Sequence, residues 1–125
     1  MRTSLAFILL TLSPALHSGD ILVADFEAED YGAWKATGDA FGKGPARGTL
    51  PSQMAVSGFE GKGLVNSYLG GDGTQGTLTS PEFRLERKYL NLLVGGGAHS
   101  GETCVNLLVG GKVVADTLDR FPRLM

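Results

Sequence analysis

Short apolar runs separated by glycine pairs are the feature that most constrains the fold of this chain. Three such runs lie between Tyr89 and Asp116, and only Gly110 and Gly111 separate the last two. Both glycines can take positive φ, which favours a tight turn of type I′ or II′. The pattern therefore predicts a β-hairpin in which residues 107–109 pair with residues 112–114.

Further apolar and β-branched segments alternate with turn-forming residues along the rest of the chain. The expected strands are residues 20–26, 31–37, 63–69, 77–83, 89–94, 103–109 and 112–115. No segment of ten or more residues has the apolar spacing of a helix, and short strands at regular spacing are typical of a sandwich. The sequence predicts an all-β fold, an antiparallel β-sandwich that is jelly-roll-like and similar to carbohydrate-binding modules.

Residues 71–76, with the sequence GDGTQG, match the spacing of a dinucleotide-binding loop. That function requires a helix after the loop, because the helix N-terminus holds the pyrophosphate. A β-branched run from Thr77 to Thr79 follows instead. We therefore interpret this segment as the loop of a β-hairpin.

The first 18 residues have the layout of a secretory signal peptide. Arg2 precedes an apolar run at residues 5–12, and Ser13 and Pro14 interrupt it. The run is too short to span a bilayer. We therefore expect a secreted or periplasmic protein whose β-sandwich module covers residues 19–116, with no membrane span.

Residues 117–125, TLDRFPRLM, have neither a strand pattern nor a turn pattern. A sandwich without its last strands has an exposed sheet edge. We therefore expect an irregular tail at a truncation, and a sandwich that is incomplete at its C-terminal end. Such a chain is expected to be poorly soluble or partly molten.

Composition excludes several classes of function. The chain has 11 basic and 13 acidic side chains, a net charge of −2, and its basic residues form no patch for nucleic acid. Cys104 is the only cysteine, which excludes a disulfide framework. Because Cys104 lies in an apolar run, we expect an unreactive thiol in the core.

Candidates for metal binding and catalysis are few. Asp25 and Glu27 form an acidic cluster with Glu29 and Asp30, and such oxygen ligands can help to hold a structural Ca²⁺ ion. The alternative is a solvated acidic turn, and the spacing is not that of an EF-hand. His99 is the only histidine after residue 18, too few for a triad or a metal site. We expect no catalytic residue and no cofactor apart from that ion.

Aromatic side chains are the candidates for sugar binding, because their flat faces can stack on the apolar faces of sugar rings. Tyr31, Trp34 and Tyr68, together with His99, are the residues expected to bind carbohydrate. Trp34 fits a core position equally well.

A family resemblance covers residues 20–114. It rests on the segments ADFE, FGKGPARGTLP, GFEGKGLVNSYLGGD, GTLTSPEF and YLNLLVGGGAHSGETCVNLLVGGKVV. These segments resemble the β-sandwich module of secreted fructan-degrading enzymes of glycoside hydrolase family 32, the levanases and their relatives. The resemblance implies an accessory module that contributes to carbohydrate binding beside a catalytic β-propeller.

The resemblance also implies what this chain lacks. The propeller of the family carries N-D-P-N and R-D-P motifs and a glutamate next to cysteine, and none of these occurs in this sequence. We therefore expect the chain to be inactive by itself, while the parent enzyme hydrolyses β-fructosidic bonds in levan, inulin or sucrose-like substrates. The alternative is a free-standing secreted module for carbohydrate binding or surface interaction, with no enzyme attached.

Overall fold

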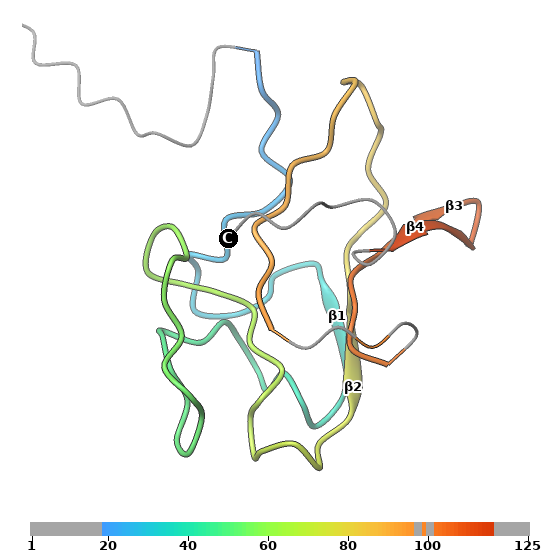
Figure 1. Ribbon diagram of the computed structural model, residues 1–125. Helices are drawn as coiled ribbons and strands as arrows, with labels where there is room; N and C mark the ends of the chain where they lie inside the picture. Colours follow the sequence, from blue (N-terminus) through green and yellow to red (C-terminus); the bar gives the residue numbers. More distant parts are fainter. Residues whose placement is uncertain (1–18, 97–98, 100–101, 117–125) are drawn as a thin grey trace, which may run out of the picture. The chain divides into compact units, whose positions relative to one another are not determined.

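The computed structural model describes residues 19–96, 99 and 102–116 (Figure 1). These residues form four strands and no helix: β1 (Lys35–Gly38), β2 (Gly76–Thr79), β3 (Asn106–Val109) and β4 (Lys112–Asp116). β1 pairs with β2, and β3 pairs with β4, both antiparallel. The all-β antiparallel prediction is confirmed, although the described residues form two two-stranded sheets rather than a closed sandwich.

The chain divides into two compact units. Unit 1 runs to Lys88 and contains β1 and β2, and unit 2 begins at Tyr89 and contains β3 and β4. No described segment is a helix that could cross a membrane. The predicted signal peptide at residues 1–18 and the predicted tail at residues 117–125 lie outside the described residues.

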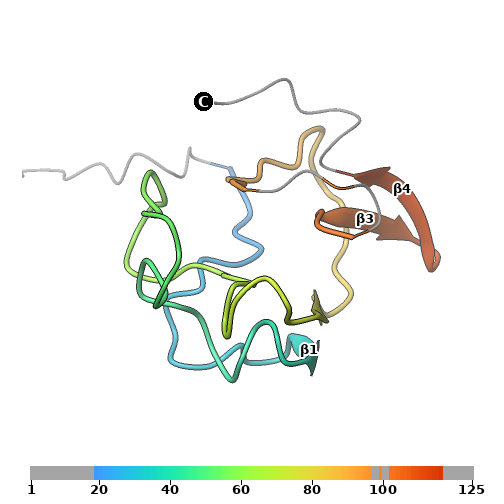
Figure 2. The same cartoon turned by 60° about the horizontal axis from the view of Figure 1, so that its bottom comes forward.

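The β3–β4 hairpin of unit 2 forms where the sequence predicts it (Figure 2). Gly110 and Gly111 have φ of 57° and 77°, and positive φ at both turn positions defines a type I′ turn. The register shifts by one residue beyond the turn, so that Leu107 pairs with Ala115 and not with Val114. The predicted pairing is therefore correct next to the turn and wrong at its far end, where a bulge enters β4.

The sheet of unit 1 joins two segments that lie far apart in the sequence. On β1 and β2, the hydroxyl oxygens of Thr37 and Thr77, 40 residues apart, lie 2.6 Å from each other. β1 ends at Gly38, whose φ is 71° and whose Cα approaches the carbonyl oxygen of Gln75 so closely that a Cβ would overlap it. β2 ends shortly before Pro81, which has no N–H to continue a ladder.

Three of the predicted strands do not form. Residues 20–26 and 89–94 belong to no strand, and residues 63–69 contribute only one isolated bridge, between Leu64 and Ala46. Apolar content predicted these strands, but a strand also requires a partner in register. Without a sheet to cover them, apolar side chains of the first two segments are exposed.

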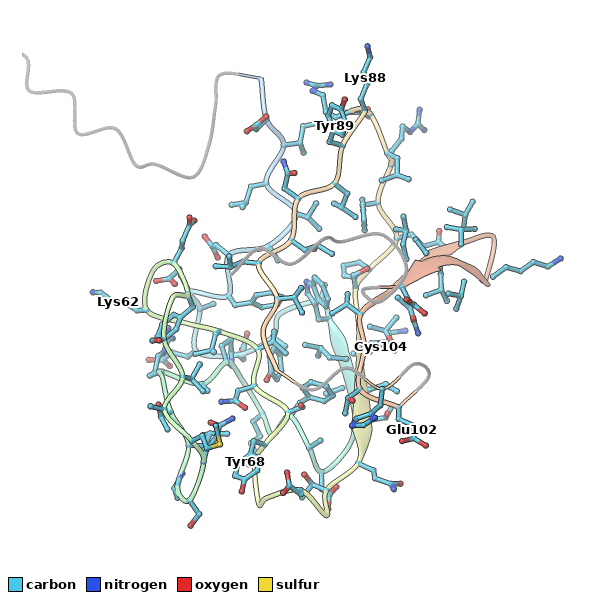
Figure 3. The ribbon with its side chains drawn as sticks, viewed as in Figure 1. Lys62, Tyr68, Lys88, Tyr89, Glu102 and Cys104 are labelled. Atoms are coloured by element: carbon cyan, nitrogen blue, oxygen red, sulfur yellow. The ribbon has the colours of Figure 1, made fainter. Side chains whose placement is uncertain are left out.

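The core of the described residues is small. Tyr31 and Ala40 are its buried hydrophobic residues, at 7% and 3% exposure, and Asn66 is buried as well. Cys104 is only half-buried and precedes β3, so the prediction of a core thiol is wrong (Figure 3). Its Sγ donates to Oδ1 of Asn106 at 3.5 Å.

Candidate carbohydrate-binding site

A shallow groove in unit 1 brings together three residues that the sequence singled out: Asp25, Tyr31 and Trp34. The groove has a volume of about 300 Å³. Besides alanine and glycine, its lining consists of Asp25, Phe26, Asp30, Tyr31, Trp34 and Pro81. We call it the Trp34 groove.

The aromatic residues of the Trp34 groove play different parts. Trp34 is half-buried, and its ring meets that of Phe26 edge to face, with centroids 5.1 Å apart and planes at 66°. Tyr31 is buried, and its hydroxyl donates to the carbonyl oxygen of Phe41 at 2.9 Å. Burial raises the pKa of Tyr31. Of these two rings, that of Trp34 is the more accessible to a ligand, because Tyr31 is buried and bonded to Phe41.

Phe26 has an unusual backbone conformation, with φ of 57°. This left-handed region is strained for a bulky residue, at a cost of about 1–3 kcal/mol, and such strain persists only where surrounding contacts impose it. The conformation places the ring of Phe26 against Trp34. The shape of the groove thus depends on contacts made by the rest of unit 1.

Four hydrogen bonds hold the segment that carries the groove. Nη2 of Arg47 donates to the carbonyl oxygens of Glu27 at 3.0 Å and Ala28 at 2.9 Å. Oε1 of Glu27 accepts the backbone N–H groups of Lys62 at 2.8 Å and Gly63 at 2.9 Å. We call this set the Glu27–Arg47 latch. The Lys62 side chain itself extends outward from its loop (Figure 3).

The latch changes the acidity of Glu27. Hydrogen bonds from the N–H groups of Gly63 and Lys62, with a smaller contribution from the positive charge of Arg47, lower the pKa of Glu27 below its ordinary value of 4.5. These bonds favour the ionised form. The carboxylate of Glu27 is therefore charged at neutral pH and committed to the backbone of the loop around Lys62.

Two glycines let their loops approach the latched segment. A Cβ on Gly63 would overlap the carbonyl oxygen of Phe26, and a Cβ on Gly44 would overlap that of Glu29. Neither glycine has a positive φ, so close approach is what these positions require. Packing and hydrogen bonding together fix residues 26–29 against the two glycine-rich loops.

The predicted calcium ligands bond to the backbone in this structure. Oδ1 of Asp25 accepts the N–H of Glu27 at 3.1 Å, and Oε1 of Glu27 accepts the two N–H groups of the latch. Within the described ranges, no group of three or more histidine, cysteine, aspartate or glutamate side chains is placed to hold a metal ion. The calcium site stays a prediction without a ligand cluster in this part of the chain.

The other two predicted sugar-binding residues do not line the Trp34 groove. The hydroxyl of Tyr68 donates to the carbonyl oxygen of Ser52 at 3.2 Å, and the backbone N–H of Tyr68 donates to Oδ1 of Asn66 at 3.1 Å (Figure 3). Asn66 and Gln53 exchange two amide hydrogen bonds, at 2.8 and 3.0 Å. Tyr68 therefore belongs to a separate polar cluster. His99 is exposed in unit 2.

The glycine-rich segment at residues 71–76 leads into β2 and not into a helix. Gly71 has φ of 99° and donates its N–H to the carbonyl oxygen of Tyr68 at 2.9 Å. The segment is a loop as predicted, but it does not join a hairpin, because residues 63–69 form no strand and β2 pairs with β1.

Sequence reasoning missed three residues of the site. The sequence pattern places Phe26 in an expected strand and Asp30 in an acidic cluster, and it gives Arg47, in the segment FGKGPARGTLP, no part in a site. The run of glycines around Arg47 was the available signal, because such a run permits close approach to another backbone. The sequence does not say which backbone that is.

The sequence is related to a glycosyl hydrolase. It is 45% identical over 97 residues to a protein of Aspergillus rugulosus named "Putative glycosyl hydrolase ecdE". The match covers 75% of this chain and 14% of that protein, so the chain spans about one seventh of the length of this relative. No protein-family profile and no solved structure matches the chain.

Proposed function

We propose that this chain is a non-catalytic accessory module of a secreted, glycoside hydrolase family 32-like fructan hydrolase, and that the Trp34 groove binds carbohydrate. The relation to a protein named as a glycosyl hydrolase supports the first part. The observation that carries the second part is the groove itself, whose lining includes a half-buried tryptophan and two aspartates. Stacking on a ring and hydrogen bonding to acidic side chains is a common way to hold a sugar.

The catalytic step belongs, in this proposal, to a propeller domain outside this chain. That domain would hydrolyse β-fructosidic bonds, as levanases, inulinases and invertases do, and the module would hold the polysaccharide near it. The sequence of the chain contains none of the propeller motifs. Purified chain should therefore release no fructose from levan, and release of fructose would contradict this part of the proposal.

Export and domain limits are part of the same proposal. Residues 1–18 would act as a signal peptide, residues 19–116 would form the module, and residues 117–125 would be an irregular tail. A secreted module is the form in which binding to an extracellular polysaccharide is useful. Expression in a bacterial or fungal host that removes signal peptides, followed by determination of the N-terminus of the mature protein, tests the boundary between residues 18 and 19.

Affinity electrophoresis tests the binding function. The wild-type chain should migrate more slowly in a native gel that contains levan or inulin than in a gel without polysaccharide. Trp34→Ala should remove this retardation, because the accessible ring of the groove is lost. Tyr68→Phe is the matched control: it removes only a hydroxyl that is bonded to Ser52, outside the groove, and should leave the retardation unchanged. Absence of retardation on every fructan would refute the binding proposal.

A further inference from the structure

Residues 81–89 form the longest run of exposed residues in the part of the chain that the structure describes. No strand includes any of them. Their backbone groups form no hydrogen bond with a described residue, except that the carbonyl oxygen of Glu86 accepts a hydrogen bond from Nη1 of Arg87 at 3.1 Å. An endoprotease binds several residues of its substrate in extended form through their backbone groups, so an exposed loop without such bonds is a preferred site of cleavage.

The same segment carries a group of basic side chains. Arg84, Arg87 and Lys88 lie close together, and Arg87 and Lys88 are the one pair of adjacent basic residues in the sequence. A protease whose primary pocket contains a carboxylate cuts after a basic side chain, because the pocket pairs with the positive charge. The 81–89 segment therefore combines an accessible backbone with the side chains that this class of protease recognises.

The surroundings of the three basic side chains single out Lys88. Nε of Arg87 donates to the carbonyl oxygen of Gly19 at 2.8 Å, so a protease pocket would have to replace this bond as well as the bond to Glu86. Arg84 has a glutamate two positions away on both sides, and these charges oppose an acidic pocket. Lys88 forms no hydrogen bond or ion pair with a described residue, and its side chain extends outward (Figure 3).

We propose that the 81–89 segment is a site of limited proteolysis, at which an endoprotease with an acidic primary pocket hydrolyses the peptide bond between Lys88 and Tyr89. Water is the co-reactant: the bond between carbon and nitrogen breaks, the carbonyl group of Lys88 becomes a carboxylate, and the nitrogen of Tyr89 becomes an amino group. This inference goes beyond the proposed function, because it does not depend on what the Trp34 groove binds.

The position of this bond gives the cut a consequence. Lys88 is the last residue of unit 1, which carries the Trp34 groove, and Tyr89 is the first residue of unit 2. Cys104 is the only cysteine, so no disulfide within the chain links the two parts after the cut. Cleavage therefore ends the covalent connection between the groove and everything that follows it in the chain.

Lys62 provides a comparison within the same unit. It is exposed, and its side chain also extends outward (Figure 3). Its backbone is held in place, because the N–H groups of Lys62 and Gly63 donate to Oε1 of Glu27, and the N–H of Leu64 donates to the carbonyl oxygen of Ala46 at 3.0 Å. A protease must break these bonds before the loop can extend, so an exposed lysine side chain is not sufficient for a cut.

Digestion of the full chain with a lysine-specific endoprotease tests the inference. All lysines of the chain lie within the described residues: Lys35, Lys43, Lys62, Lys88 and Lys112. At a low ratio of protease to chain, mass spectrometry should find the cut after Lys88 first, as a pair of fragments that end and begin there. This cut should be faster than the cut after Lys62 by about tenfold or more, because only the loop around Lys62 must open first.

Two variants assign the cut to this position. Lys88→Gln should remove the first pair of fragments. Lys62→Gln makes the same change at another exposed position and should leave that pair unchanged. A first cut after any other lysine would overturn the inference, as would equal rates of cleavage after Lys62 and Lys88. Retardation on fructan is measured without protease, so the proposed function and this inference can fail separately.

Discussion

Replacement of Gly63 by alanine should destabilise the chain, because an added Cβ has no room at this position. Gly63 is buried and donates its N–H to Glu27. A Cβ at this position would overlap the carbonyl oxygen of Phe26 and would lie 2.9 Å from Nη1 of Arg47. Arg47 could swing away only by giving up its bonds to Glu27 and Ala28, and the backbone of Phe26 cannot move easily.

The expected cost follows from what must move. Adding a methyl group to a tightly packed site typically costs about 1–3 kcal/mol. Here the atom to be displaced belongs to Phe26, a residue that is already strained, with φ of 57°. We therefore expect about 2–3 kcal/mol, at the upper end of that range. The free energy of unfolding of a small protein falls by about 1 kcal/mol per molar urea, so the urea midpoint should fall by about 2–3 M.

Urea unfolding followed by Trp34 fluorescence measures this effect, because the Trp34 ring contacts Phe26. Gly73→Ala is the matched control: Gly73 has no heavy atom within 4 Å of an added Cβ, and its φ is not positive. That variant should be unchanged or slightly more stable, by up to about 1 kcal/mol. Equal midpoints for the two alanine variants would refute the packing argument.

Three further predictions concern the latch, the core and metal binding. The latch stabilises the fold above pH 4.5, the ordinary pKa of Glu27. This stabilisation is lost as the pH falls through the lowered pKa of Glu27 in the folded chain. Glu27→Gln should therefore weaken the change in Trp34 emission that acid causes. Tyr31→Phe should lower the free energy of unfolding by about 1 kcal/mol, because it removes the hydrogen bond to Phe41. Burial raises the pKa of Tyr31, so the wild-type chain should lose stability as the pH rises above 10.0, and Tyr31→Phe should not show this loss. Addition of a chelator should leave the thermal midpoint unchanged, since Asp25 and Glu27 already bond to backbone N–H groups, and a lower midpoint would restore the calcium prediction.

Local chemistry made part of the fold predictable. The pair Gly110 and Gly111 specifies the turn of the β3–β4 hairpin without help from distant residues. The strand predicted for residues 77–83 ends at Thr79 instead, shortly before Pro81, which has no N–H for a ladder. The bulge in β4 had no such signal, because the turn sets the pairing next to it and does not specify an extra residue farther along the strand. Predicted strands at residues 20–26 and 89–94 failed because apolar content does not supply a partner strand.

Contacts between distant segments explain what the sequence could not predict in the site. Glu27 looked like a metal ligand because the sequence does not reveal that the N–H groups of Lys62 and Gly63 point at its carboxylate. Trp34 fits both a core position and a sugar platform, and a half-buried ring is compatible with both. Phe26 takes a conformation that its own residue type disfavours, which only tertiary contacts impose.

Calorimetric titration of the wild-type chain and of Trp34→Ala with inulin-type or levan-type oligosaccharides tests the central claim, that the Trp34 groove binds carbohydrate. The account predicts saturable heat of binding for the wild type with at least one of the two oligosaccharides, and its loss in Trp34→Ala. Binding that is equal in the two proteins would contradict the assignment of the groove, and absence of binding to both oligosaccharides in the wild type would contradict the proposed function.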